Sequence, residues 1–259
     1  MYDFHSHVLF GVDDGAKDEE MALNMLRIAA ESGTKVIVAT PHFVRDRFQV
    51  PRNKIKAKVE KLRELAKENQ IPIELYLGQE VYYSEQILKY YEDGEIGTIE
   101  NTRYMLVELP MREFHTERVI DGFYELQLKG IKVILAHPER YEEFIKKPDL
   151  INRFIEEGFL FQLNTGSIAG DFGKNVKKTA EVFLKNRVYS IIGSDAHRDK
   201  SRNTDMTSGV KAIEKIKPGM TREFMMNAEK ILKDEEVKCK GKKVSKAKGI
   251  KGLLKRAFN

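Results

Sequence analysis

The first fifteen residues, Met1 to Gly15, read MYDFHSHVLFGVDDG. Tyr2 to His5 is predicted to form a short strand, which leads through His5-Ser6-His7 into a loop. Residues two apart in an extended segment point to the same side, so His5 and His7 present two imidazoles to one point. Neutral imidazole is the commonest metal-donor side chain, and this pair suits Zn, Mn or Fe. Two ligands do not make a site, so two histidines on a strand face without a metal remain the alternative at this point.

Seven strand-like segments alternate with helical segments along the chain. The predicted strands are residues 2–5, 35–39, 73–77, 104–107, 132–136, 160–163 and 189–192. The predicted helices are residues 18–32, 53–69, 84–91, 117–129, 149–157, 175–185, 208–216 and 222–233. Strands that alternate with helices imply parallel β-α units, and these apolar strands favour an α/β fold of the distorted (β/α)7 barrel type over an open sheet. No GxGxxG loop follows the first strand, which argues against dinucleotide binding.

Six of the seven predicted strands run directly into a histidine or an acidic residue. These residues are His5 and His7, His42, Glu80, Glu108, His137, and Asp195 with His197. A parallel barrel collects the carboxyl ends of its strands on one face, where active sites form. With one aspartate of the first loop, Asp13 or Asp14, the chain delivers nine potential metal ligands to one mouth.

A cluster of carboxylates and imidazoles requires cations, because like charges repel and desolvation is costly. One ion takes only about four to six ligands, so two or three ions are expected. Nitrogen and oxygen ligands without thiolate suit Mn, Fe or Zn, and the share of carboxylates favours Mn2+. Glu80 can bridge two ions with its two oxygens.

Paired metals about 3.5–4 Å apart typically hydrolyse phosphate esters with a hydroxide that attacks phosphorus. The phosphate oxygens also need cations, and arginine forks serve best. Arg140 lies three residues beyond His137, and Arg202 lies five residues beyond His197. Both arginines are predicted to reach the mouth and bind phosphate, with an ordinary surface salt bridge as the alternative for each.

Four further residues lie beside this pattern. Asn164 ends the sixth predicted strand and is a candidate for hydrogen bonding to a ligand or the substrate. Glu139 and Asp199 lie near the mouth and are expected to be solvated. His115 lies away from every strand end and is expected in a loop or at a helix start.

Several motifs together resemble a known family. They are His5-Ser6-His7, Gly11-Val12-Asp13-Asp14-Gly15, Ala39-Thr40-Pro41-His42, Gly78-Gln79-Glu80, Glu108-Leu109-Pro110, Ala136-His137-Pro138-Glu139-Arg140 and Ser194-Asp195-Ala196-His197. They resemble the PHP-superfamily metallohydrolases, and more closely the bacterial manganese-dependent tyrosine-protein phosphatases of capsule and exopolysaccharide operons. The resemblance covers about residues 1–233.

The resemblance implies a PHP-type barrel with a trinuclear metal centre at the carboxyl ends of the strands. It implies one metal held by His5, His7, Glu80 and Asp195, a second by Glu80, Glu108 and His137, and a third by Asp14, His42 and His197. The choice of Asp14 over Asp13 rests on the resemblance and not on spacing. Arg140 and Arg202 match the family's phosphate-binding arginines, and His137 joins them in the predicted catalytic set. The family also implies dephosphorylation of an autophosphorylated bacterial tyrosine kinase that controls polysaccharide synthesis.

Other functions fit the sequence less well. Cysteine-dependent phosphatase chemistry is excluded, because the only cysteine, Cys239, lies away from every strand end. The nearest alternative is a small-molecule phosphatase of the same superfamily, such as a histidinol-phosphate phosphatase. A carbon–nitrogen hydrolase is disfavoured by the two arginines, since its substrates carry no phosphate. A catalytically silent, metal-stabilised scaffold is disfavoured because every ligand position is filled.

Composition and charge limit the remaining possibilities. The single cysteine and the lack of a signal peptide or a long apolar run predict a cytoplasmic protein. Residues 237–259 contain nine Lys or Arg and no acid, which leaves residues 1–236 at −4 and argues against nucleic-acid binding. We therefore predict a phosphatase domain over residues 1–236 and a flexible basic tail over residues 237–259. The tail is a solvated arm or makes weak contact with anionic membrane, with residues 252–258 as a short amphipathic anchor. Oligomeric state stays open.

Overall fold

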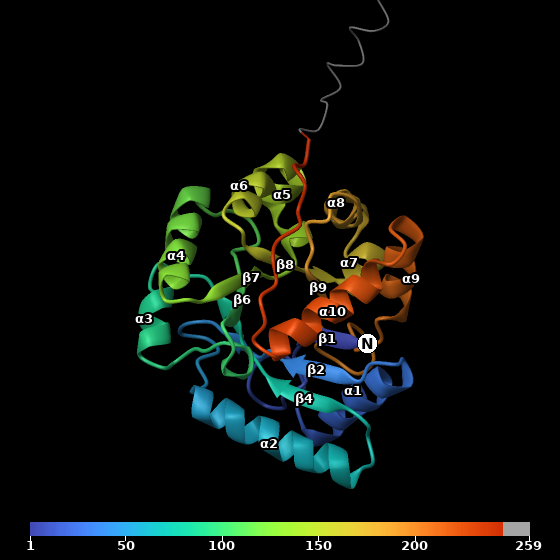
Figure 1. Ribbon diagram of the computed structural model, residues 1–259. Coiled ribbons are helices and arrows are strands. Elements are labelled where there is room, and N and C mark those ends of the chain that lie inside the picture. Colours follow the sequence, from blue (N-terminus) through green and yellow to red (C-terminus); the bar gives the residue numbers. More distant parts are fainter. Residues whose placement is uncertain (246–259) are drawn as a thin grey trace, which may run out of the picture.

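The computed structural model describes residues 1–245 and places parallel strands at the centre of the protein (Figure 1). The strands are β1 (Tyr2–Ser6), β2 (Val36–Ala39), β3 (His42–Phe43), β4 (Glu74–Leu77), β5 (Glu80–Tyr82), β6 (Tyr104–Glu108), β7 (Lys132–Leu135), β8 (Leu160–Asn164) and β9 (Ile191–Gly193). One sheet has the order β1-β2-β4, and the other has the order β3-β5-β6-β7-β8-β9. Every pairing between these strands is parallel.

Two interrupted strands connect the two sheets. β2 is followed after residues 40–41 by β3, and β4 is followed after residues 78–79 by β5. Elsewhere, Ser6 at the end of β1 forms an isolated parallel bridge with Ala196, just beyond β9. Each strand predicted from the sequence is present, and β3 and β5 are short additions. The α/β class is therefore confirmed as a curled, parallel arrangement, although the strand pairing does not show one continuous (β/α)7 barrel.

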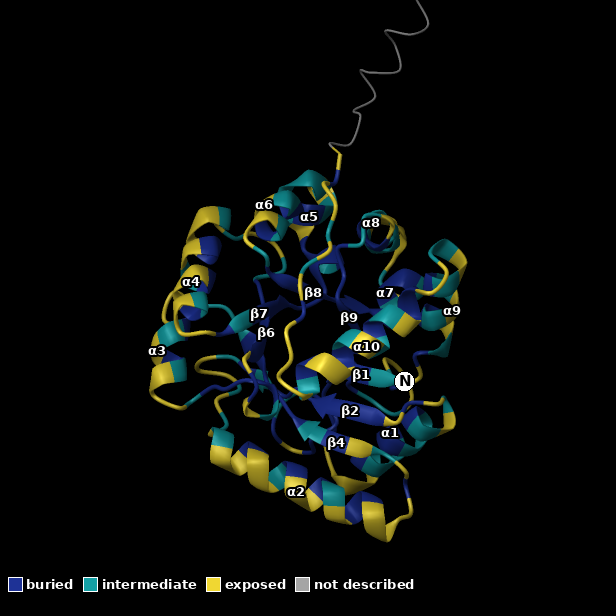
Figure 2. Cartoon of the chain, viewed as in Figure 1, coloured by how far each residue is buried: buried dark blue, intermediate teal, exposed yellow. Residues whose placement is uncertain are grey.

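The helices lie around the sheets and direct their exposed faces outward (Figure 2). They are α1 (Glu19–Glu31), α2 (Arg52–Glu68), α3 (Ile87–Glu92), α4 (Thr116–Leu128), α5 (Glu142–Lys146), α6 (Ile151–Glu156), α7 (Thr165–Ala169), α8 (Lys174–Lys185), α9 (Thr207–Ile216) and α10 (Met220–Leu232), with 3-10 turns at Ile99–Asn101, Pro138–Arg140 and Pro148–Leu150. Each predicted helix lies within a few residues of its expected position. α5 and α7 were not predicted, because five residues are too few to show an apolar period.

α1 illustrates how the sequence sets the limits of an element. The Asp18 carboxylate accepts a hydrogen bond from the Met21 N–H at 2.9 Å, which is an N-cap. Gly33 follows the helix with a φ of +87°, a conformation that glycine adopts without steric cost. Met25 and Leu26 point inward and are fully buried. Together these features anchor the loop between β1 and α1, which carries the candidate aspartates.

Apolar side chains inside the curled sheets form a cluster that α10 covers at one end. The strands contribute Phe4, Val38, Leu106 and Ile134, and α10 contributes Ala228 and Ile231. Tyr2, the first residue of β1, donates from its hydroxyl to Glu229 of α10 at 3.0 Å. Asn227 of α10 donates to the Ser190 carbonyl, directly before β9, at 2.8 Å. α10 therefore lies at the amino ends of the strands, which leaves the opposite end for the site.

Residues 237–245 pack against the body, which corrects the prediction of a flexible tail from residue 237. Val237 and Val244 are each 2% exposed. The N–H and carbonyl of Val244 both bond to the Asn152 side chain, at 2.8 and 2.9 Å. Isolated valines among lysines show no apolar period, so their burial depends on distant residues that the local pattern does not reveal. Residues 246–259, which include the predicted membrane anchor, lie outside the described residues.

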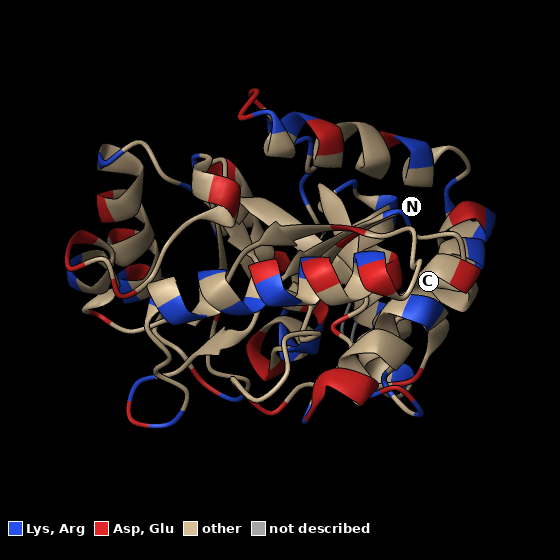
Figure 3. Cartoon of the chain, turned by 90° about the horizontal axis from the view of Figure 1, so that it is seen from below, with Lys and Arg blue, Asp and Glu red and all other residues tan. Residues whose placement is uncertain are grey.

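Basic and acidic residues alternate along the outer helices in the view of Figure 3. Within residues 1–245, no helix combines the length and apolar character needed to cross a bilayer.

Candidate metal centre

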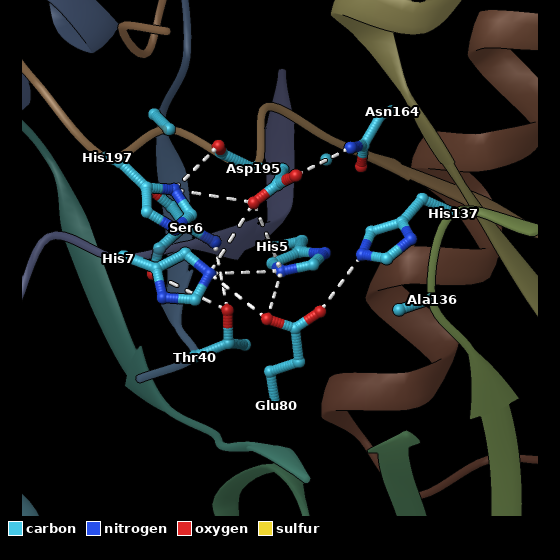
Figure 4. Close-up of polar contacts among 12 residues, drawn as sticks. His5, Ser6, His7, Thr40, Glu80, Ala136, His137, Asn164, Asp195 and His197 are labelled. Carbon is cyan, nitrogen blue, oxygen red and sulfur yellow. Dashed lines mark hydrogen bonds and ion pairs between the residues drawn. The ribbon is translucent and has the colours of Figure 1, made fainter. Parts of the chain in front are cut away.

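All nine side chains predicted as metal ligands converge at the carboxyl ends of the strands. They are His5, His7, Asp14, His42, Glu80, Glu108, His137, Asp195 and His197. In Figure 4, the labelled members of this set point toward one another from several different strands and loops. Asp14 has the most exposed side chain, at 42%, and the others lie deeper.

Glu80 lies in the middle of the cluster. Its Oε2 is 3.1 Å from His5 Nε2 and 3.2 Å from His7 Nε2. The same oxygen is 3.0 Å from His42 Nδ1, and Oε1 is 3.1 Å from His137 Nε2. One carboxylate therefore faces four imidazoles, which is the position that a residue bridging two cations needs.

Asp14 gathers a second group of ligand atoms. His7, Asp14, His42 and His197 each offer an atom within 4.8 Å of the others. Asp14 Oδ1 is 3.6 Å from His42 Nε2 and 3.4 Å from His197 Nε2. Oδ1 of Asp14 is buried and has no hydrogen-bond partner within residues 1–245.

Asp13 is engaged in a different way. Its Oδ2 accepts from His7 Nδ1 at 2.7 Å and from the His42 N–H at 2.9 Å. Its Oδ1 accepts from the Gly15 N–H at 2.8 Å. Asp13 thus shapes the loop and orients His7, whereas the Oδ1 atom of Asp14 is available to bind a metal ion. The geometry favours Asp14 in the choice that spacing alone left open.

A chain of amide side chains sets the position of the proton on His5. The ionised Asp195 carboxylate can only accept, so Asn164 Nδ2 donates to it at 2.8 Å. Asn164 Oδ1 then accepts from Gln162 Nε2 at 2.8 Å. Gln162 Oε1 in turn pairs with His5 Nδ1 at 2.9 Å. These bonds place the His5 proton on Nδ1 and turn the lone pair of Nε2 toward Glu80.

The atoms at the centre fit divalent cations. His5 Nε2 and His7 Nε2 lie 3.2 Å apart, and both face Glu80 Oε2, an oxygen without a hydrogen-bond partner within residues 1–245. Although burial lowers both values, the charges on Glu80 and Asp195 raise the pKa of His5, and Asp13 raises the pKa of His7 well above its usual range. In the neutral form that binds a cation, each imidazole carries its proton on Nδ1, and three electron-rich atoms then point at one another. Burial and the charges on Glu80 and Asp195 raise the pKa of Glu108 well above its usual range. A cation removes both the lone-pair repulsion and the carboxylate repulsion.

Two histidines of the cluster, unlike His5 and His7, have a lowered pKa. Burial and the nearby Arg140 lower the pKa of His137 to about 4. Burial and His7 lower the pKa of His197 to about 2. Neutral imidazole is the form that binds a metal.

The two predicted phosphate-binding arginines both hold Asp195. Arg140 Nη1 is 2.5 Å from Asp195 Oδ2, and Arg202 Nη2 is 2.9 Å from Oδ1. The ring of Phe172, between α7 and α8, lies near both guanidinium groups, 4.6 Å from Arg140 Cζ and 5.7 Å from Arg202 Cζ. The structure thus brings both arginines to the edge of the cluster.

Three residues of the site adopt positive φ angles. The values are +29° for His137, +53° for Asp195 and +45° for Arg202. Residues other than glycine rarely enter this region, at a cost of about 1–3 kcal/mol each. Such strain persists where the surrounding structure holds the backbone, and it gathers at functional sites.

Asp3 was not predicted as a residue of the site. Its carboxylate connects the segment that carries His5 with the segment that carries Asp195. It is fully buried, and it accepts from the His5 N–H at 3.2 Å and the Ser194 N–H at 2.9 Å. The Ser194 hydroxyl donates to it at 2.6 Å. The sequence did contain an indication of this role, because an acidic residue is unusual inside a short strand that is otherwise apolar.

Glu139 was expected to be solvated, and this prediction was wrong. Its side chain is fully buried, where it accepts from the Asn164 N–H at 3.1 Å and the Tyr189 hydroxyl at 2.9 Å. Burial raises the pKa of Glu139 to about 7. The role of Asn164 in hydrogen bonding a predicted ligand is confirmed, and His115 is exposed before α4, as expected.

A curled parallel arrangement of strands that gathers histidines, carboxylates and two arginines at one end defines an α/β protein with a candidate metal centre. The family model described as "Capsular polysaccharide synthesis, CpsB/CapC" matches residues 1–233. The chain belongs to this family.

Three relatives named as tyrosine-protein phosphatases align with most of the chain. A putative tyrosine-protein phosphatase CapC of Staphylococcus aureus is 35% identical over 204 residues, which is 78% of this chain and 79% of that protein. The tyrosine-protein phosphatase CpsB of Streptococcus pneumoniae is 32% identical over 247 residues, 91% of this chain and 99% of that protein. The tyrosine-protein phosphatase YwqE of Bacillus subtilis (strain 168) is 30% identical over 240 residues, 92% of this chain and 93% of that protein.

Solved structures agree with this assignment. One solved structure matches with a TM-score of 0.90 and 28% identity. It belongs to a study of YwqE from Bacillus subtilis and CpsB from Streptococcus pneumoniae, which are described as unique metal-dependent tyrosine phosphatases. The match covers 95% of this chain and all of the solved chain. A histidinol phosphate phosphatase of Lactococcus lactis matches at a TM-score of 0.52 and 14% identity over 83% of this chain and 93% of that chain, which shows a shared fold alone.

Proposed function

We propose that this protein is a metal-dependent phosphotyrosine phosphatase that acts on phosphorylated protein in capsular polysaccharide synthesis. One observation carries the proposal: Arg140 and Arg202 meet Asp195 at the edge of the ligand cluster, so phosphate-binding forks and metal ligands share one mouth. The relatives named as tyrosine-protein phosphatases support the substrate class. The description of the family supports the process.

The proposed cations divide the ligands into three sets. His5, His7, Glu80 and Asp195 would hold one, Glu80, Glu108 and His137 a second, and Asp14, His42 and His197 a third. The contacts support this division with two additions, since His7 also lies within reach of the third set and His42 also lies within reach of Glu80 and Glu108 in the second. Bound cations supply positive charge to the phosphoryl oxygens and lower the pKa of water enough to yield a hydroxide nucleophile near pH 7.

The residues of the chain prepare the phosphate site. Arg140 and Arg202 each present several N–H donors, of which Asp195 takes only some, so the remaining donors can bind phosphate oxygens. Phe172 orients both guanidinium planes by cation–π contact. The leaving tyrosine phenolate has a pKa near 10, so its departure needs no strong general acid.

Five finer statements belong to the same proposal. The substrate is an autophosphorylated bacterial tyrosine kinase, the metal is Mn2+ and the compartment is the cytoplasm. The sheets form a distorted (β/α)7 barrel, for which the interrupted strands and the bridge from Ser6 to Ala196 are the support. The phosphatase domain comprises residues 1–236, and the packed segment 237–245 adjoins it.

Phosphate release from a phosphotyrosine peptide tests the proposal. The protein is treated with a chelator and assayed before and after addition of Mn2+, with histidinol phosphate in parallel. Activity that returns with Mn2+ and favours the peptide is the expected result. Mn2+-dependent activity confined to histidinol phosphate would replace the proposed substrate by the small-molecule alternative. Activity untouched by thorough chelation would overturn the metal centre.

A further inference from the structure

A cavity of about 710 Å3 borders the loop that leads to Asp14. Its walls are two loops, residues 10–12 and 49–51, and one face of α2 that carries Lys54, Lys58 and Lys61. We call the cavity formed by these residues the lysine groove. Phe10 and Val12 line its floor and are each only 8% exposed. The groove therefore combines an apolar floor with a basic rim.

Both loops of the lysine groove lead directly into the metal centre. Val12 lies two residues before Asp14, so an extended backbone separates them by at most about 7 Å. Gln49 follows Phe48, whose ring stacks on His42 with a centroid distance of 5.9 Å and an interplanar angle of 9°. A polypeptide with one side chain in the metal centre would therefore place residues two or three positions away in the groove.

The rim of the lysine groove is positively charged and unneutralised. The three lysines are spaced four and three residues apart, so they share one face of α2. Lys58 Nζ lies 3.9 Å from the ring centroid of Phe10, which places its ammonium over the floor. Glu19 is the one acid in the lining. Within residues 1–245, the ion pairs of α2 involve Arg63 and leave the rim lysines without an acidic partner.

We propose that the lysine groove binds an extended acidic segment that flanks the phosphotyrosine of the substrate protein. The inference rests on the proposed function and specifies the chemistry of its substrate. Carboxylates would pair with the ammonium groups, while the aliphatic parts of the segment cover Phe10 and Val12. A larger cavity of about 820 Å3 borders the starts of β2 and β4. It lies at the amino ends of the strands, out of reach of a peptide held at the metal centre.

Three phosphotyrosine peptides of ten residues test the lysine groove. One carries three glutamates before the phosphotyrosine, one carries them after it, and the third has glutamines at all these positions. For the wild-type protein with Mn2+, one of the acidic peptides should show a KM about tenfold below that of the neutral peptide, as expected for three exposed ion pairs. p-Nitrophenyl phosphate, which is too small to reach the groove, measures the basal activity.

Two triple variants with the same change in net charge separate the groove from the general field of the protein. Lys54→Gln/Lys58→Gln/Lys61→Gln should abolish the preference for the acidic peptide and leave kcat/KM for p-nitrophenyl phosphate unchanged. Lys56→Gln/Lys67→Gln/Lys211→Gln removes three exposed lysines outside the groove and should keep the preference.

The outcomes distinguish this proposal from the proposed function. Equal KM values for the acidic and neutral peptides, or an acidic preference that survives the groove variant, would overturn the lysine groove alone. A groove-dependent attraction to phosphatidylserine vesicles without any peptide preference would assign the surface to membrane lipid instead and overturn it as well. No hydrolysis of p-nitrophenyl phosphate or any peptide would overturn the proposed function and the groove with it.

Discussion

Replacing Gln162 with methionine is expected to weaken Mn2+ binding while the protein still folds. Methionine matches glutamine in length but has no amide, so it removes the bonds to His5 Nδ1 at 2.9 Å and to Asn164 Oδ1 at 2.8 Å. The His5 proton is then free to move to Nε2, the nitrogen that faces Glu80. A proton there competes directly with a cation.

The magnitude follows from the contacts. Hydrogen bonds of this kind behind a metal-binding histidine contribute about 10- to 100-fold in metal affinity, or about 1.4–2.7 kcal/mol. Gln162 is fully buried, and its Oε1 also accepts the His137 N–H at 3.3 Å. The substitution therefore also leaves buried polar groups unpaired, and we expect the free energy of unfolding to fall by about 2–4 kcal/mol.

Calorimetric titration of the metal-free protein with MnCl2 measures the affinity, and a guanidinium melt measures the stability. Gln162→Glu keeps an acceptor for His5 and loses only the donor to Asn164, so it should retain more affinity than Gln162→Met. Gln127→Met serves as the control, because the Gln127 side chain on α4 bonds to the distant Glu157 carbonyl at 3.2 Å. It should bind Mn2+ like the wild type.

Two results would contradict this prediction. If Gln162→Met melts cooperatively and binds Mn2+ with wild-type affinity, the amide chain does not control the His5 proton. An equal loss of affinity in Gln127→Met would assign the effect to general destabilisation.

Four further predictions concern the site and the body. Arg140→Lys keeps the charge but loses the fork, and kcat/KM for a phosphotyrosine peptide should fall about 100-fold; unchanged kinetics would exclude phosphate binding by this arginine. Phe172→Leu should raise KM about three- to fivefold with little change in kcat, as loss of a cation–π contact implies; a fall in kcat alone would contradict this role. Mn2+ at about 100 times its Kd should stabilise the metal-free protein by about 2.7 kcal/mol and raise Tm by roughly 5–10 °C, and a scanning calorimeter would reveal an absence of any shift. Burial raises the pKa of Glu223, but Lys240 and Arg187 outweigh it and lower that pKa below 4.5, so the stabilisation is present above that value and is lost as pH falls through the folded pKa. Glu223→Gln should therefore cost about 1 kcal/mol at pH 7 and much less once the pH is below the folded pKa in urea melts, and a loss independent of pH would rule out the ion pair as its cause.

Much of the site was predictable because its ligands lie at strand ends. Strands such as β2 and β7 can be recognised in the sequence as short apolar runs. The polar residues that follow them are of the types that bind metal ions. A parallel arrangement then brings His42, Glu80 and His137 together wherever the strands pair. The expected position of both arginines follows from their short distance along the chain to His137 and His197.

Other features of the site were not predictable from local patterns. Gln162 sits in the alternating run of β8, where nothing in the sequence indicates that it bonds to His5, 157 residues away. Glu139 was misjudged because exposure depends on what packs over a side chain, here Tyr189 and the backbone of Asn164. The valines at 237 and 244 were missed for the same reason.

The alternation of strands and helices, the ligand types at the strand ends and the charge of the chain could be read from the residues alone, because these features depend on residues near one another. Three features depend on the tertiary structure: within residues 1–245 Asp14 rather than Asp13 offers an oxygen without a hydrogen-bond partner, two arginines share Asp195, and a basic groove adjoins the loop of Asp14. Each of these depends on the directions of side chains from segments far apart in the chain. Such directions are set by packing and hydrogen bonding across the whole fold, which no local period encodes.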